Sequence, residues 1–147
     1  MKKLLVVAAL ATCLNAAWAA LGGAPSNFGP RVLSAQTRSA STGQSTFTES
    51  ERTLESGTTV HEYVDAAGVV FAVSWSGPYM PDLKELLGTH FDTMVAHANS
   101  TARPGRTQLL LKQSDLVVVS GGHMGAFQGK AWLPARVPAG FDTKGIK

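Results

Sequence analysis

The stretch from Gly57 to Gly88, GTTVHEYVDAAGVVFAVSWSGPYMPDLKELLG, constrains the fold of this chain more than any other. Its first half alternates around Asp65-Ala-Ala-Gly68, where Asp can open a type I turn and Gly can adopt the left-handed conformation that closes it. Two antiparallel strands are therefore expected to meet at this turn. If Val64 faces Val69, the alternation separates two faces. The mainly apolar face holds Val60, Val64, Val69, Phe71, Val73 and Trp75, and the mixed face holds His61, Tyr63, Val70, Ala72 and Ser74.

The second half of the stretch predicts a change from strand to helix. Gly77-Pro78 and Pro81 exclude a continuing strand, and Asp82 followed by Glu85 is the capping-box pattern of a helix start. An apolar stripe about 100° wide then predicts one amphipathic helix that can cover the hairpin. Gly88 would lie in its middle, so a break into two short helices is the alternative. The stripe consists of Leu83, Leu86, Leu87, Phe91, Met94, Val95 and Ala98.

Four further segments have the patterns of strands. Ser45 to Glu51 alternates weakly and predicts an edge strand, while Thr107 to Lys112 and Leu116 to Ser120 surround a Gln-Ser-Asp turn. A glycine-rich connection then leads to a last strand at Ala126 to Leu133. Strands joined by short connections around one helix predict an α+β fold. We expect an antiparallel sheet of five or six strands with the helix packed on one face, in the chain order strand, strand, strand, helix, strand, strand, strand.

The N-terminus has the pattern of a secretory signal peptide. A basic Met1-Lys2-Lys3 precedes an apolar run from Leu4 to Leu14, and Ala17-Trp18-Ala19 predicts cleavage between Ala19 and Ala20. The apolar run is shorter than the roughly 20 residues that span a bilayer, so no membrane span is expected after cleavage. Cys13 allows a lipoprotein signal as an alternative, but the Thr before it fits that pattern poorly. The protein is expected to be periplasmic or secreted.

Composition divides the rest of the chain into three parts. With 44% apolar and 16% charged residues, the chain is typical of a globular protein. Residues 20–44 are rich in Gly, Ala, Ser and Thr and have no sustained period, which predicts a flexible N-terminal arm. Residues 45–134 are expected to form a single α+β domain. Pro134, Pro138 and Gly140 then predict that residues 135–147 form an extended tail.

Charge and cysteine content exclude several classes of function. Removal of Lys2 and Lys3 with the signal leaves 11 basic against 10 acidic residues, so the net charge falls from +3 to +1. A nearly neutral chain lacks the clustered cations that phosphate-backbone binding requires, so we expect no nucleic-acid partner. The single cysteine, Cys13, leaves with the signal. Neither a disulfide nor thiol chemistry is expected.

The histidines do not have the spacing of a metal site. His61-Glu62 resembles the start of the zinc-protease motif, but that motif needs a second His at the position of Asp65 and needs a helix. His90 and His97 are seven residues apart, roughly 10 Å along a helix, and cannot share one ion. We therefore expect no metal and no cofactor. Glu62 is unusual because the alternation places it on the apolar face, where a carboxylate needs either solvent or a buried partner.

No complete catalytic pattern occurs in the sequence. The G-x-S-x-G elbow is absent, and the glycines before Lys130 lack the spacing of a phosphate loop. The weak catalytic candidates are His61, Glu62 and His123, which the fold would have to bring together. Ser74 shares the mixed face with His61, but as a diagonal neighbour roughly 7 Å away.

Large aromatic residues near the Gly77-Pro78 turn are weak candidates for a binding groove. These are Trp75, Tyr79 and Trp132, together with Phe127. Aromatic side chains at strand ends more often close a core, whereas exposed ones would mark an interface.

An ordered set of short motifs runs through the chain after the signal. The motifs are Leu21-Gly-Gly-Ala-Pro25, Ser56-Gly-Thr58, Glu62-Tyr-Val-Asp65, Gly68-Val-Val-Phe71, Trp75, Gly77-Pro78, Pro81-Asp-Leu83, Leu86-Leu-Gly88, Ser114-Asp-Leu-Val-Val118 and Ser120-Gly-Gly-His123. This set is similar to a family of small exported proteins from Gram-negative bacteria, domain of unknown function twenty-eight forty-four. The resemblance covers nearly the whole chain after the signal and implies a bacterial protein that is periplasmic or released. It implies no activity, cofactor or catalytic residue.

Three functional hypotheses are compatible with the sequence. The leading one is an exported, non-enzymatic module that binds a protein or a small ligand in the cell envelope. The alternative is a small exported hydrolase built from polar residues across the sheet. A third is an accessory subunit held by its N-terminal arm, which predicts that the fold survives deletion of residues 20–44.

Overall fold

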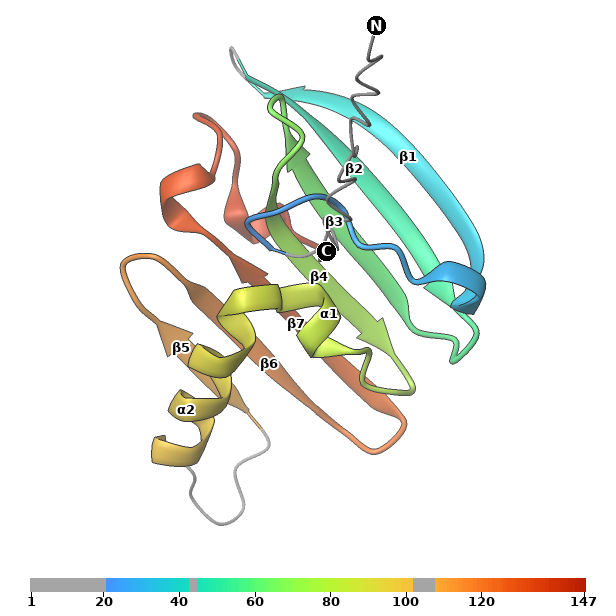
Figure 1. The fold of residues 1–147 in the computed structure, drawn as a ribbon, viewed down its shortest axis with the longest axis vertical. Coiled ribbons are helices and arrows are strands. Elements are labelled where there is room, and N and C mark those ends of the chain that lie inside the picture. The colour runs from blue at the N-terminus through green and yellow to red at the C-terminus, as the bar shows by residue number, and fades with distance from the viewer. Residues whose placement is uncertain (1–20, 43–44, 102–107) are drawn as a thin grey trace, which may run out of the picture.

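The computed structural model describes residues 21–42, 45–101 and 108–147, and the predicted signal peptide lies outside them. The described residues form one antiparallel sheet of seven strands in the order β1-β2-β3-β4-β7-β6-β5 (Figure 1). The last strand along the chain, β7, lies between β4 and β6. It therefore joins the strands that precede the helices, β1 to β4, to the strands that follow them, β5 and β6. The strands are β1 (Val32–Thr42), β2 (Ser45–Leu54), β3 (Thr59–Asp65), β4 (Val70–Gly77), β5 (Leu109–Lys112), β6 (Val117–His123) and β7 (Ala126–Trp132).

The predicted fold was wrong in its number of strands and in their order along the chain. The sheet has seven strands rather than five or six, and four of them precede the helical segment. The additional strand is β1, which lies within the segment expected to be an irregular arm and pairs with β2 along its length. Because residues 33–39 are exposed, β1 needs no apolar alternation and is stabilised by the backbone ladder. The β2 segment, expected at an edge, is an inner strand.

The predicted single helix is two helices joined by a turn of 3-10 helix. Asp82 accepts a hydrogen bond from the backbone N–H of Glu85 at 3.1 Å and starts α1 (Leu83–Leu87). Gly88 has φ of +53°, which ends α1, and residues 88–90 lead into α2 (Phe91–Thr101). Positive φ is strained for any residue with a side chain, so the break occurs at Gly88, which lies between Leu87 and Phe91 of the apolar stripe.

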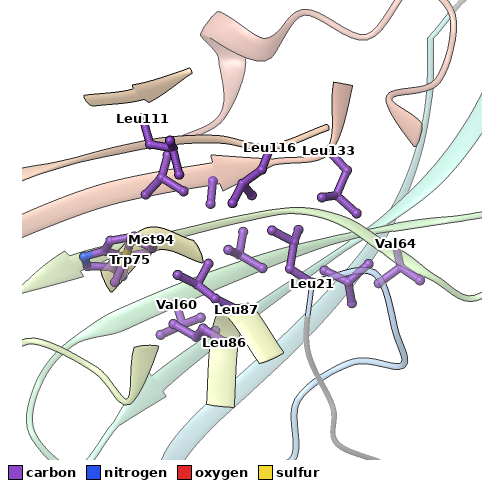
Figure 2. Close-up of a cluster of buried hydrophobic side chains, with 14 of the residues drawn as sticks. Leu21, Val60, Val64, Trp75, Leu86, Leu87, Met94, Leu111, Leu116 and Leu133 are labelled. Atoms are coloured by element: carbon purple, nitrogen blue, oxygen red, sulfur yellow. The ribbon is translucent and has the colours of Figure 1, made fainter. Parts of the chain in front are cut away.

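The main core lies between the sheet and the two helices, on the side that we call the helix face (Figures 1 and 2). Leu86, Leu87 and Met94 come from the helices and pack against strand residues such as Val60 and Trp75. Two residues ahead of β1, Leu21 and Phe28, are each only 2% exposed and belong to this core. The N-terminal segment, residues 21–31, is thus part of the packed structure.

Backbone hydrogen bonds hold the N-terminal segment in place. The N–H of Leu21 donates to the carbonyl of Leu86 at 2.9 Å, and the N–H of Gly22 donates to the carbonyl of Val70 at 2.8 Å. Val70 in turn donates to the carbonyl of Gly23 at 2.9 Å. The segment therefore connects α1 to the start of β4.

The hairpin of β3 and β4 forms at the predicted turn, but its register differs from the expected one. Asp65 accepts from the N–H groups of Ala67 and Val69, and Gly68 has φ of +80°. A register shift follows, because Val64 pairs with Val70 and Tyr63 pairs with Ala72. The resulting bulge turns Phe71 away from the helix face. On the helix face, Val70 occupies the position that was predicted for Val69 and Phe71.

The opposite side of the sheet, which we call the tail face, is partly covered by the C-terminal segment, residues 134–147. Phe141 lies 5.0 Å from the rings of both Phe47 and Phe71, in edge-to-face geometry. Ile146 is only 4% exposed and packs in the same cluster. The expected extended tail instead contains two turns of 3-10 helix, at Pro134–Arg136 and Thr143–Gly145. It leaves Leu110 of β5 and Val119 of β6 exposed on this face.

Candidate functional site

Glu62 lies on the helix face and is completely buried. Its carboxylate accepts one hydrogen bond from the backbone N–H of Ser26 at 2.8 Å and another from the Arg52 guanidinium. The partners come from the N-terminal segment and from β2, so one carboxylate links three parts of the chain. A buried carboxylate with a charged partner and a backbone donor is satisfied. It has no access to a substrate, and its role is structural.

His61 lies on the tail face and contacts acids from β2. Its Nδ1 is 3.0 Å from Oε1 of Glu49 and 3.9 Å from Oε2 of Glu51. Directly across the hairpin it faces Ser74, because the turn and the bulge shift the pairing from the expected diagonal. Lys130 of β7 faces Ser74 from the other side. The structure thus brings an acid, a histidine and a serine together in a way that the sequence did not predict.

The Ser74 hydroxyl, however, is closed to a substrate. Its side chain is completely buried, and no hydrogen bond of normal geometry reaches it from a described residue. The end of the C-terminal segment is held on the same face of the sheet, since the Lys147 N–H donates to the Tyr63 hydroxyl at 3.3 Å. Burial raises the pKa of Tyr63 above its ordinary value of 10.0. In this arrangement the Ser74 hydroxyl cannot attack a bound substrate.

The open part of the tail face carries a groove of about 500 Å³. One wall is apolar, formed by Leu110 and Val119, whose exposed fractions are 63% and 37%. Beside it, the lining continues with Lys130 on the neighbouring strand β7 and with the end of the C-terminal segment, Ile146 and Lys147. A volume of this size is within the range of small-molecule sites.

A second hollow of about 390 Å³ continues the groove toward the β6–β7 turn. It is lined by Pro78, His123 and Phe127 and shares Ser76 and Gln128 with the first hollow. Ser76 and Gln128 are cross-strand partners on β4 and β7. We call the two hollows together the tail-face groove, an elongated site along the middle of the sheet.

The predicted site residues do not converge in this groove. His123 lines its second hollow, where its Nδ1 is 3.0 Å from the carbonyl of Met124, whereas His61 and Glu62 lie outside both hollows. Trp75 is buried in the helix-face core and contributes to the lining of the first hollow. Trp132 packs on the tail face beside Phe71, and Tyr79 is 64% exposed and lines neither hollow. The three aromatic residues therefore do not form a single binding surface.

Sequence reasoning missed the residues that do line the groove. Leu110 and Val119 are apolar residues on the second face of strands whose first face already supplies Leu111 and Val118 to the core. Nothing in the local sequence shows that Leu110 and Val119 stay exposed beside the C-terminal segment.

No cluster of three or more His, Cys, Asp and Glu side chains is placed among the described residues to hold a metal ion. No helix in residues 21–42, 45–101 or 108–147 has the length and apolar character needed to cross a bilayer.

The fold and the groove define a small single-sheet protein with a helical cover on one face and a partly open second face. The model of a family described as a protein of unknown function, DUF2844, matches residues 17–146. The chain belongs to this family, and the predicted family resemblance is confirmed. No curated protein and no solved structure matches the chain.

Proposed function

We propose that this protein is an exported, non-enzymatic binding module of the bacterial cell envelope, and that it holds its ligand in the tail-face groove. The observation that carries the proposal is the groove itself, two joined hollows of about 500 and 390 Å³ on the face that the helices leave free. The N-terminal signal pattern supports export. An elongated groove with one apolar wall suits a small or extended ligand.

The hydrolase alternative is favoured by one contact, the 3.0 Å approach of His61 Nδ1 to Glu49. Two observations weigh against it. Ser74 is completely buried, and neither Ser74 nor His61 lines the groove. A nucleophile must reach the reacting atom of a bound substrate, so the arrangement supports binding better than catalysis.

The test is the recovery of a ligand with the protein. The protein is purified from the cell envelope and unfolded, and the released small molecules are identified by mass spectrometry. Val119→Trp fills the groove, while Leu33→Trp makes an equally large change at a residue that is 66% exposed on β1. We expect a compound released from wild type and from Leu33→Trp, and at least tenfold less of it from Val119→Trp.

Equal release from all three proteins would count against the groove as the site. Hydrolysis of simple esters that disappears in Ser74→Ala and in His61→Ala would restore the hydrolase hypothesis. Export is tested separately by the mass of the purified protein, which should correspond to a chain that begins at Ala20.

A further inference from the structure

We infer that the ligand of the tail-face groove is an anionic amphiphile, a carboxylate or phosphate head group on an apolar chain, with its head at Lys130. This inference rests on the proposed function, because it names the ligand class of the same groove. Its starting point is a row of side chains across the tail face. Leu110 of β5 pairs with Val119 of β6, and Val119 pairs with Lys130 of β7.

The charge of the groove is positive. Lys130 and Lys147 are its two lysines, and no Asp or Glu side chain is among the described residues that line either hollow. The ammonium of Lys147 is 3.6 Å from Glu49, so its charge is partly balanced. No described carboxylate forms an ion pair with Lys130, so its charge is left for a ligand.

Lys130 is positioned by the C-terminal segment. Its side chain is partly buried, and its Nζ donates to the carbonyls of Thr143 at 3.4 Å and Ile146 at 3.3 Å. An ammonium has three N–H donors, so one of them remains after these two bonds. A partly desolvated cation with only neutral partners gains more from an anion than a fully hydrated one does.

The apolar wall begins directly beside this cation. Neighbouring strands are about 4.8 Å apart, so Val119 and then Leu110 extend the row roughly 10 Å from the Lys130 strand to the β5 strand. Both side chains are exposed although they are aliphatic, at 37% and 63%. A ligand with an anion at Lys130 and an apolar chain across β6 and β5 would cover both of them. A simple inorganic anion would leave these two apolar side chains uncovered, and Lys130 would repel the head group of a cationic amphiphile.

The test compares four probes by isothermal titration calorimetry, with the two anionic amphiphiles below their micelle concentrations and dodecanol below its solubility limit. Dodecanoate and dodecyl phosphate carry both features, dodecanol carries the chain alone, and inorganic phosphate carries the charge alone. We expect the two anionic amphiphiles to bind wild type about tenfold or more tightly than dodecanol, because a charge-assisted hydrogen bond adds at least that factor. The ratio between the carboxylate and the phosphate distinguishes the two head groups.

Two lysine variants locate the head group. Lys130→Met should reduce dodecanoate affinity about tenfold to a hundredfold and leave dodecanol affinity unchanged, whereas Lys130→Arg should retain the binding of dodecanoate. Lys84→Met, at an exposed lysine of α1, is the matched control and should bind like wild type. Thermal unfolding of each variant identifies loss of binding that follows from loss of folding.

The outcomes separate this inference from the proposed function. If dodecanol and dodecanoate bind equally and Val119→Trp blocks both, the groove is a binding site, but the inference that its ligand carries an anionic head group is wrong. If dodecanoate binds but Lys130→Met leaves its affinity unchanged, the placement of the head group is overturned. If no probe binds and no compound co-purifies with wild type, both the inference and the proposed function fail.

Discussion

The Glu62 carboxylate accepts a hydrogen bond from the Arg52 guanidinium, and through this contact a completely buried charge joins β2 to β3. The same carboxylate receives the N–H of Ser26, so the pair also holds the N-terminal segment against the sheet. Removing one member of a buried ion pair leaves the other charge without compensation, which is far more costly than the absence of both.

The first prediction concerns this pair. Arg52→Met should destabilise the protein by about 3–5 kcal/mol, because Glu62 would stay buried without its cation. The double variant Arg52→Met/Glu62→Leu should recover most of that loss, since it removes the uncompensated charge. Chemical denaturation of wild type and the variants measures the free energy of unfolding.

The control is a different ion pair, in which the arginine is more exposed than Arg52. Arg136 lies 3.7 Å from Asp65, and the Arg136 side chain is 48% exposed. Arg136→Met should cost at most about 1 kcal/mol. If Arg52→Met costs no more than Arg136→Met, Glu62 does not depend on its pair in the way the structure indicates.

The second prediction concerns the contact of Gly129 with Trp75. A Cβ placed on Gly129 would lie 2.2 Å from a ring carbon of Trp75, whose side chain is buried in the core. Gly129→Ala should therefore destabilise the protein by about 1–3 kcal/mol or more, because the ring has to shift. Gly145→Ala is the matched control, since nothing lies within 4 Å of its added Cβ. Thermal unfolding should show a clear fall in Tm for the first variant and almost none for the second.

The third prediction concerns alkaline pH. Burial raises the pKa of Tyr63 in the folded protein above 10.0, so above about pH 10 the unfolded chain loses the phenolic proton while the folded protein retains it. The stability that Tyr63 contributes is thus fully present below pH 10 and is lost as the pH rises through the folded pKa. Tyr63→Phe should remove this part of the pH dependence.

Comparing slopes isolates the contribution of Tyr63 from that of the groups that both proteins share. The free energy of unfolding between pH 9 and 11.5 should fall less steeply for Tyr63→Phe than for wild type. Tyr79→Phe, at a tyrosine that is 64% exposed, is the control for loss of a phenolic hydroxyl outside the buried cluster. Identical slopes for wild type and Tyr63→Phe would show that burial does not control this titration.

The fourth prediction concerns the N-terminal segment, which the accessory-subunit hypothesis treated as a dispensable arm. Phe28 is 2% exposed in the main core, so Phe28→Ala should cost about 3–5 kcal/mol. Leu33→Ala, at a residue that is 66% exposed, should change stability by less than about 0.5 kcal/mol. Deletion of residues 20–44 should abolish folding, as measured by circular dichroism and amide exchange. A folded deletion variant would support the arm hypothesis instead.

Local features of this fold could be predicted because they depend on neighbouring residues. Asp65 and Gly68 specify the turn through a side-chain acceptor and a positive φ, and Asp82 starts α1 through its bond to the N–H of Glu85. The alternation of side chains along the strand also predicted that Glu62 lies on the same face of the sheet as Val60. The family could be identified from the order of short motifs.

Strand partners and their register were decided only in the tertiary structure. β1 has no apolar pattern because its ladder with β2 stabilises it, and the bulge at Phe71 depends on packing against Tyr63 and Phe141. The groove depends on β7 inserting between β4 and β6, which brings Lys130 beside Val119. Turn chemistry and side-chain period are local properties of the backbone, so the sequence by itself determined the hairpin, the helix start and the place of Glu62. Pairing between distant strands depends on the whole sheet, so the tertiary structure alone decided which side chains form the groove.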